Sequence, residues 1–424
     1  MKKIIKAKGP LFFFSGSLVI TNFFTTLIIA RSLGFGLELD LYYIALSVYL
    51  FLLAAIGWSL TNVITPILIK EGVDNTLAKI FYVLFVWSIL IFLILFLFSP
   101  LLVKLIFNNY LDDYSTSSIR MLFFLSCSVF FVDLLAQVFV CFENASERYV
   151  RAVFINFLSS IAGLVFANYL VEHFGIFGAM SVQLIMKLLL FSILLFLNFK
   201  FLTYFEYDKK IAFQLYSKAK YFFVSGFYYR TEDLVEKYIA SYLAPGYLSL
   251  VSFVQRIYGA VITVVNTSVI TPTLTRFCNS NNIGQRNSDY KLMKLVSSLI
   301  VILSIISFPI IYFFGNEFLS VLFRDKLASV EGSVTFVLIS LFPTVLLLII
   351  NQLLHNFLLS RSQEKKIAVF DMISYTLSLL AKVFLTYKFG LFGFVLGILF
   401  TSLLKLCFKL LIVIKVVNSE KALG

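Results

Sequence analysis

Five charged side chains lie close together in one otherwise apolar stretch of the sequence, residues 219–243. They are Arg230, Glu232, Asp233, Glu236 and Lys237. On a helix, Asp233 stands one turn from Arg230 and one turn from Lys237, so opposite charges can partly neutralise each other. One carboxylate remains in excess, and it must hold a proton, bind a cation or pair with another helix. The sequence therefore predicts either an ion-coupling site or a structural set of salt bridges here.

The surroundings of these charges are those of a membrane protein. Hydrophobic residues make up 60% of the 424 residues and charged residues 13%, which leaves too little polar surface to cover a water-soluble protein. Spans must be helices or closed barrels because lipid offers the backbone no hydrogen bonds, and these apolar runs are too long for barrel strands. We therefore predict an all-α polytopic membrane protein. About twelve spans are expected, at 10–31, 41–67, 80–106, 119–142, 150–171, 175–200, 219–243, 248–275, 292–314, 333–359, 366–387 and 390–416.

Short sequence segments repeat in the same order in the two halves of the chain. Val-Ile-Thr-Pro at 63–66 returns at 269–272, and the Phe-Gly-x-Phe-Gly pattern at 174–178 returns at 389–393. Ordered duplicates in a hydrophobic chain are typical of a two-lobed transporter with the substrate path between its lobes. The repeated glycines fall where a close turn must begin the last span of each half.

The repeats predict two six-helix lobes, an N-terminal one at 1–205 and a C-terminal one at 206–424. Six spans per half is an even number, so both halves enter the membrane from the same side. Their pseudo-symmetry axis should then run along the membrane normal, as in a parallel repeat. Lysines alternating with aromatic residues near 206–220 favour an interfacial amphipathic helix that links the lobes.

Basic residues determine the expected orientation. With the amino terminus in the cytoplasm, 22 basic residues face inside and six face outside, as the positive-inside rule requires. We therefore expect both termini in the cytoplasm and a location in the bacterial cytoplasmic membrane. The net charge of +13 then reflects topology and attraction to anionic membrane lipids, and no nucleic-acid partner is predicted.

Isolated charges within the spans are further candidates, because a charge in the bilayer is costly to keep. Arg256 is the strongest candidate for a substrate diphosphate, since guanidinium stays charged and forks onto phosphate oxygens. Asp40 either caps the second span or acts in transport. Arg31 either attracts an anionic ligand or lies among the outer headgroups. Asp133 and Lys187 are lone charges that either line a cavity or pair locally.

The remaining polar residues predict neither a metal site nor a bound cofactor. The histidines His173 and His355 have no ligating or catalytic companion in the sequence. Lys405 and Lys409 stand one turn apart in the last span, where we expect them to extend to the inner headgroups. H⁺ and Na⁺ both remain open as coupling ions.

Four segments resemble one transporter family. The stretch at 30–45 is similar to that family's turn between its first two helices, and 234–241 through 255–259 is similar to its seventh and eighth helices. The stretch at 360–364 resembles the connection after its tenth helix. The family is MurJ, the lipid II flippases of the multidrug/oligosaccharidyl-lipid/polysaccharide exporter superfamily.

The resemblance implies a transporter with no enzymatic activity that works by alternating access. Helices seven and eleven approach each other in the family, which implies that Lys382 pairs with Glu236, with Asp371 nearer the inner side. Arg256 and Asp40 match charged positions of the family.

Several arginines of the family's central cavity have no counterpart. Val19, Thr25 and Leu53 stand in their places, which favours a relative that exports another polyprenyl-linked glycan, as Wzx flippases do. The expected substrate is a polyprenyl-diphosphate-linked oligosaccharide, either lipid II or an O-antigen or capsule unit, moved from the inner to the outer leaflet for the cell envelope. Polysaccharide assembly machinery is a possible partner. The alternative function is a cation-coupled drug antiporter of the same superfamily.

Overall fold

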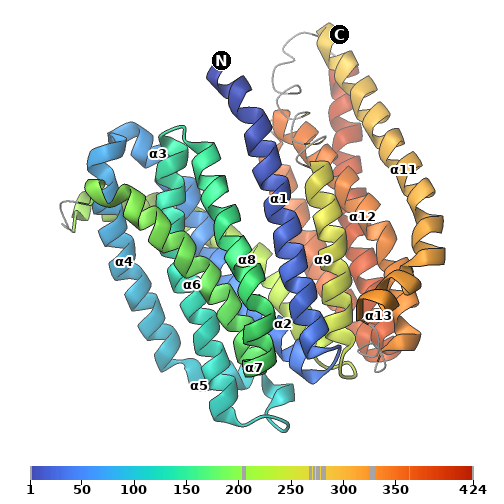
Figure 1. The fold of residues 1–424 in the computed structure, drawn as a ribbon. Helices are drawn as coiled ribbons and strands as arrows, with labels where there is room; N and C mark the ends of the chain where they lie inside the picture. The colour runs from blue at the N-terminus through green and yellow to red at the C-terminus, as the bar shows by residue number, and fades with distance from the viewer. Residues whose placement is uncertain are drawn as a thin grey trace. The chain divides into compact units, whose positions relative to one another are not determined.

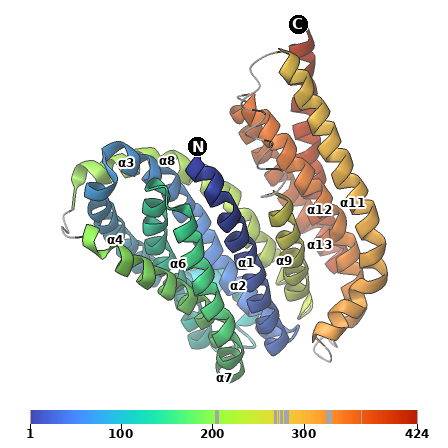
Figure 2. The same ribbon diagram turned by 45° about the horizontal axis from the view of Figure 1, so that its top comes forward.

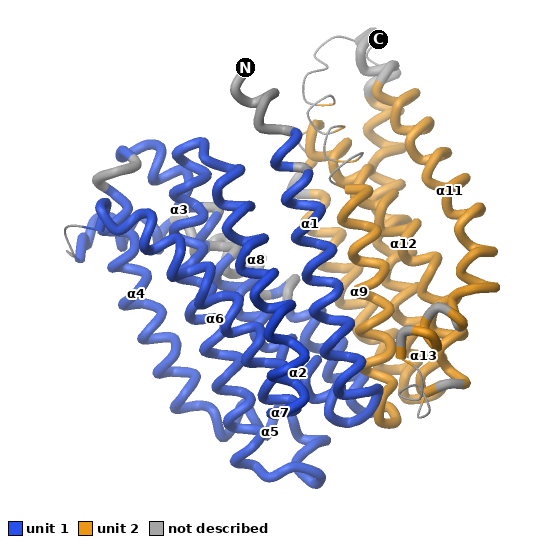
Figure 3. The backbone as a smooth tube through the Cα atoms, viewed as in Figure 1, with its two compact units in different colours: residues 1–242 blue, residues 243–424 orange. Residues whose placement is uncertain are grey.

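The structure is a computed structural model that describes residues 2–202, 207–266, 270, 273, 277, 283–323, 330–361 and 363–422. Every regular element within these residues is helical. The chain divides into two compact units, residues 1–242 and residues 243–424 (Figure 3). This confirms the predicted all-α membrane fold.

The first unit contains eight α-helices (Figure 1). They are α1 (Lys2–Leu33), α2 (Leu37–Leu52), α3 (Trp58–Glu71), α4 (Val73–Leu97), α5 (Ser99–Ile106), α6 (Thr116–Ala145), α7 (Tyr149–Asn198) and α8 (Lys209–Ala240). The long helix α7 packs against both α1 and α6. A π-helical turn, Leu53–Gly57, joins α2 to α3, and such turns often mark functional positions in helices.

The second unit is built around α12. Its helices are α9 (Tyr247–Val265), α11 (Ile283–Phe323), α12 (Glu331–Ser360) and α13 (Glu364–Ala422). Helix α12 packs against α9, α11 and α13, and Figure 2 shows these helices side by side. Phe323 and Phe357 are fully buried among them.

Helices α7 and α13 are each a hairpin of two arms. Gly175 (φ 54°, ψ −129°) and Gly390 (φ 58°, ψ −134°) interrupt them with nearly the same backbone conformation. Residues with a side chain rarely adopt such a conformation. Three residues later, a Cβ on either Gly178 or Gly393 would lie 1.9 Å from the carbonyl oxygen eight residues earlier. The close turns predicted from the repeated glycines are therefore confirmed.

Nine helices among the described residues are long and apolar enough to cross a membrane. Two of them are the α7 and α13 hairpins. Twelve spans are not confirmed, because the expected span at 219–243 is missing from the nine. It lies in α8, whose charged residues lower its mean hydropathy below that of a spanning helix.

The linker and the seventh predicted span form one continuous helix, α8. This helix packs against α2, α3 and α4 and belongs to the first compact unit. Its capping residue Asp208 accepts a hydrogen bond from Lys79 at the start of α4, at 3.0 Å. The lobe boundary near residue 205 stays a prediction from the repeats, whereas packing divides the chain after α8. Pro272, which the repeats match to Pro66, lies outside the described residues.

Candidate functional site

A buried polar cluster in the first unit is centred on Asp133 of α6. This carboxylate accepts a hydrogen bond from the Tyr49 hydroxyl at 2.6 Å and one from Gln137 Nε2 at 3.2 Å. Lys187 Nζ of α7 lies 3.0 Å from Asp133 Oδ2. Asp133 is fully buried, while the Lys187 side chain keeps 19% of its exposure. The two residues expected as lone charges therefore form a pair.

Three helices hold this cluster in place. Helix α2 contributes Tyr49, α6 contributes Asp133 and Gln137, and α7 contributes Lys187. One turn before Lys187, Gln183 donates to the Tyr42 hydroxyl at 3.3 Å, which adds a direct polar contact between α7 and α2. The π-helical turn begins four residues after Tyr49. A shift of α2 relative to α6 would therefore alter the partners of Asp133.

The chemistry available to this cluster is that of a desolvated ion pair. Removing either Lys187 or Asp133 would leave an uncompensated buried charge. Because Lys187 is the more exposed partner, an anionic ligand would reach its ammonium before it reached Asp133. The Lys187 ammonium is therefore the more accessible charge of this cluster.

The charged group in α8 is divided between buried and exposed positions. Glu236 is buried, Glu232 and Lys237 are partly buried, and Asp233 is exposed. The side chain of Arg230 lies outside the described set. Glu236 is therefore the member of the group that faces the interior of the protein. The pair predicted between Glu236 and Lys382 of α13 stays a prediction.

Asp40 does not cap α2, contrary to one of our two expectations. The helix is capped by Gly36, with no side-chain hydrogen bond, and Asp40 lies buried in the first turn. Tyr110 lies in the connection between two spans. Burial raises the pKa of its hydroxyl well above its usual range, and the nearby Asp40 carboxylate adds to this effect. Asp40 therefore belongs to a buried acidic corner of the first unit.

The two candidate arginines differ in exposure. Arg256 is partly buried in α9, whereas Arg31 is exposed in the last turn of α1. A partly buried guanidinium can grip phosphate more strongly, because fewer water molecules compete for its hydrogen bonds. Arg256 remains the better candidate of the two.

The second unit contains two buried lysines, Lys382 and Lys409, and only Lys382 was expected to lie inside the protein. Lys382 is 3% exposed and packs against Gly397 on the other arm of α13. Lys409 is also buried, and its Nζ lies 3.8 Å from Asp371 Oδ1. The expectation that Lys409 extends to the headgroups is wrong, because it turns inward to this carboxylate. His355 of α12, for which no companion was expected, lies within electrostatic reach of both residues.

Two further buried carboxylates fasten helix ends, and the sequence did not single them out. Glu143 accepts hydrogen bonds from Arg151 and from Asn198 Nδ2. Asp289 accepts one from Arg361 at 3.0 Å. Each pair joins the end of one helix to a neighbouring helix, so we assign both a structural role.

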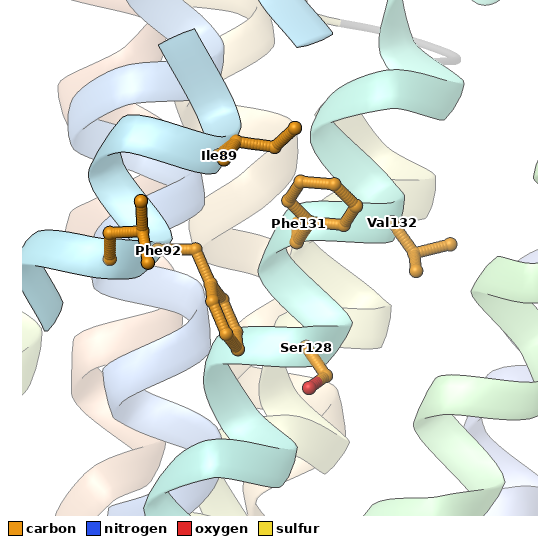
Figure 4. A pocket seen from close by; sticks show the side chains of 6 residues that line it. Ile89, Phe92, Ser128, Phe131 and Val132 are labelled. Atoms are coloured by element: carbon orange, nitrogen blue, oxygen red, sulfur yellow. The ribbon is translucent and has the colours of Figure 1, made fainter. Parts of the chain in front are cut away.

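A pocket of about 260 Å³ lies between α4 and α6 (Figure 4). Its lining residues are Ile89, Phe92, Leu93, Ser128, Phe131 and Val132. The Ser128 hydroxyl already donates to the carbonyl of Phe124 at 2.8 Å. The pocket thus offers apolar contact that suits a hydrocarbon chain, with nothing to bind a phosphate or a sugar. The described residues also contain no group of three His, Cys, Asp or Glu that could hold a metal ion.

Comparison with known proteins identifies relatives of the whole chain. A family model described as lipid II flippase MurJ matches residues 29–424. The solved inward closed conformation of lipid II flippase MurJ has 16% sequence identity and a TM-score of 0.77, over 95% of this chain and 87% of that one. An inward-facing multidrug resistance MATE transporter of the MOP superfamily has 12% identity and a TM-score of 0.72, over 97% and 95%. A MOP superfamily transporter from Pyrococcus furiosus has 12% identity and a TM-score of 0.59, over 95% and 93%. No curated protein matched the chain.

Proposed function

This chain belongs to the MurJ lipid II flippase family, and we propose that it carries a polyprenyl-diphosphate-linked glycan from the inner to the outer leaflet of the bacterial cytoplasmic membrane. The protein is a membrane transporter rather than an enzyme. The observation that carries the proposal is the family match, which extends over residues 29–424. Buried charges in both units support it, since an apolar cargo would need none of them.

Arg256 is our candidate for the group that holds the diphosphate. It is a partly buried permanent cation within an apolar helix. Two phosphates present several oxygens, and a planar guanidinium can bind two of them at once, whereas an ammonium acts as a point charge. Glycan and phosphates would cross within the protein, while the isoprenoid chain stays in lipid.

Flipping of fluorescent substrates in proteoliposomes tests this function. Lipid II carrying a reducible fluorophore is reconstituted with the protein, and an impermeant reductant reports the fraction that reaches the outer leaflet. Wild-type protein should flip the probe, Arg256→Ala should lose at least about tenfold in rate, and Arg256→Lys should recover only part. Lys104→Ala removes an exposed cation of α5 and should leave the rate unchanged. Equal rates for Arg256→Ala and wild type would exclude the assigned role.

The same assay separates the glycans and the alternative function. A second probe carries an O-antigen-type oligosaccharide on the same polyprenyl diphosphate. Faster flipping of this probe than of lipid II would identify a Wzx-like specificity. Export of a cationic dye with no flipping of either lipid would favour the drug antiporter. This chain resembles the MATE multidrug transporters in fold.

A further inference from the structure

Polar side chains line the buried seam between the two arms of α13. We call this set the polar seam. Its members are Ser374, Ser378, Lys382, Thr386, Thr401, Lys405 and Lys409. All except the partly buried Lys405 are buried. Most follow one another at four-residue intervals, so they stack about one helical turn apart on the inner faces of the two arms.

One end of the polar seam contains the Lys409–Asp371 pair and, on the neighbouring helix α12, His355. Lys409 Nζ lies 3.8 Å from Asp371 Oδ1, and the Lys409 side chain is 8% exposed. His355 lies within electrostatic reach of both groups. Its Nδ1 is buried and has no hydrogen-bond partner among the described residues. One turn earlier on α12, Asn351 Oδ1 is also buried without such a partner.

Three further contacts of described residues lie in the same part of the second unit. Lys405 stands beside Lys409 on α13. On α11, Asp289 is engaged by Arg361 at 3.0 Å. After α9, the Ile270 carbonyl accepts a hydrogen bond from Asn356, the neighbour of His355. Arg256 of α9 precedes Ile270 by fourteen residues in the sequence.

We propose that His355, Asp371 and Lys409 form a proton-binding site, and that proton binding there is coupled to transport. Two cations beside one partly buried carboxylate repel each other strongly at low dielectric. A charged Lys409 held at Asp371 therefore opposes protonation of His355, and a Lys409 displaced from the pair permits it. The site then holds one exchangeable proton, which enters from water, binds the imidazole as imidazolium and is stabilised by Asp371. No other bond forms or breaks.

The same geometry disfavours a metal cation as the ligand. A sodium ion would have to compete for Asp371 with the Lys409 ammonium, which is covalently held beside it. A proton instead binds the His355 imidazole, so Asp371 does not have to serve as its direct ligand. The inference rests on the proposed flippase function for its role in transport, and it names H⁺ as the coupling ion.

Proton binding can be measured without any substrate. The chain has two histidines, so ¹⁵N-histidine labelling of the full-length protein gives two imidazole signals, and the exposed His173 is the internal control. In phosphatidylethanolamine–phosphatidylglycerol liposomes, we expect the His355 imidazole to bind and release a proton over a pH titration. Lys409→Met should raise the midpoint by about one pH unit or more, and Asp371→Asn should lower it.

Lys409→Arg keeps the cation, so its midpoint should stay near that of wild type, and it guards against effects of misfolding. His173 should not respond to any of these changes. A His355 signal that does not titrate, or one whose midpoint is the same in Lys409→Met and Lys409→Arg, would overturn the proposal.

Coupling is tested with the fluorescent lipid II probe and an imposed pH gradient. In wild type the gradient should change the flipping rate severalfold, whereas His355→Gln should flip at one rate with or without it. Coupled titration of His355 without any flipping would contradict the proposed function and leave the proton site intact. Flipping that ignores the gradient in wild type would exclude proton coupling and leave the flippase function intact.

Discussion

The hairpins α7 and α13 differ in the residues that line the seam between their arms. Their turn glycines, Gly175 and Gly390, are 215 residues apart and share one backbone conformation, so positions 215 apart can be compared directly. The α7 positions that match the polar seam are Ser159, Gly163, Ala167, Val171, Met186, Leu190 and Leu194. All seven are buried, and only one carries a polar side chain.

One pair of matched positions on facing arms shows the same contrast. In α7, Ala167 and Val182 pack together in an apolar cluster with Met186. The matching pair in α13 is Lys382 and Gly397, where the glycine leaves room for the lysine. A hairpin of this geometry therefore folds with an apolar seam, and the lysines of α13 are not needed to form it. Buried charge that the fold does not require points to transport.

The largest effect is expected where the two hairpins are alike. In Gly178→Ala and in Gly393→Ala, the new Cβ would lie 1.9 Å from the carbonyl oxygen of Leu170 or Leu385. Backbone must move in both cases, and we expect each variant to lose about 4 kcal/mol or more in free energy of unfolding. Thermal unfolding in detergent measures this loss.

Two matched glycines serve as controls for that experiment. A Cβ on Gly16 of the first unit or on Gly259 of the second meets nothing within 4 Å. Gly16→Ala and Gly259→Ala should therefore leave stability unchanged or raise it slightly. If only one of the two turn variants were destabilised, the hairpins would not be equivalent.

This part of the structure was predictable from the sequence, because the turn depends on local chemistry. The repeated Phe-Gly-x-Phe-Gly segments indicated a close turn at Gly178 and at Gly393, and the backbone confirms it. Apolar runs likewise indicated helices, since burial in lipid requires little more than length and composition. The charged residues of α8 lower its mean hydropathy, so composition alone does not identify it as a span. Its packing against α2 and α3 assigns it to the first unit.

The partners of the buried charges were not predictable in the same way. Asp133 and Lys187 are 54 residues apart, and their contact depends on how α6 and α7 are rotated against each other. Helical periodicity gives the face of one helix and not the residue that faces it. The neighbours of His355 on α13 were missed for this reason. The spacing of Lys405 and Lys409 indicated only that these two lysines share one face of their helix.

The next largest effect concerns a charge that the first hairpin has and the second lacks. Lys187 matches Ser402 of α13, whose hydroxyl donates to the carbonyl of Ile398 within the helix. Lys187→Met would leave Asp133 buried without its cation, so we expect a loss of about 3–5 kcal/mol. Asp133→Asn together with Lys187→Met should recover most of this loss, and Ser402→Ala should cost less than about 1.5 kcal/mol. Thermal unfolding again provides the measurement, and a harmless Lys187→Met would show that the pair contributes little.

A moderate effect is expected from converting the second hairpin into the first. In Gly397→Val, the Cβ would lie 2.7 Å from Lys382 Cγ and 3.0 Å from Lys382 Cα. Overpacking of this kind costs about 1–3 kcal/mol. Adding Lys382→Ala reproduces the Ala–Val pair of α7 and should restore stability while transport of the lipid II probe is lost. Retained transport in the double variant would show that Lys382 serves the fold alone.

The smallest effect concerns α8, which the repeats assign to the second half and packing assigns to the first. The hydrogen bond from Lys79 on α4, and then those from the backbone N–H groups of Ile211 and Lys210, hold the pKa of Asp208 below its ordinary value of 3.8. A lowered pKa means that the contact stabilises the folded state above the ordinary value and is lost as pH falls through the lower, folded-state value. Because Asp208 lies at the surface, the change should be small and confined to the first turn of α8.

Hydrogen exchange of residues 209–215, corrected for the intrinsic pH dependence of exchange, detects this change. In wild type, protection should decline as pH falls below the ordinary value of 3.8 and through the lower, folded-state value. Lys79→Met should lower protection at neutral pH and flatten its acid dependence, because the main cause of the lowered pKa is gone. Lys210→Met is the matched control, since Lys210 contacts Asp208 through its backbone N–H and should behave like wild type. If Lys79→Met and Lys210→Met behaved alike, the Lys79–Asp208 contact would not fasten α8 to α4, and the repeat-based boundary near residue 205 would gain support over the division by packing.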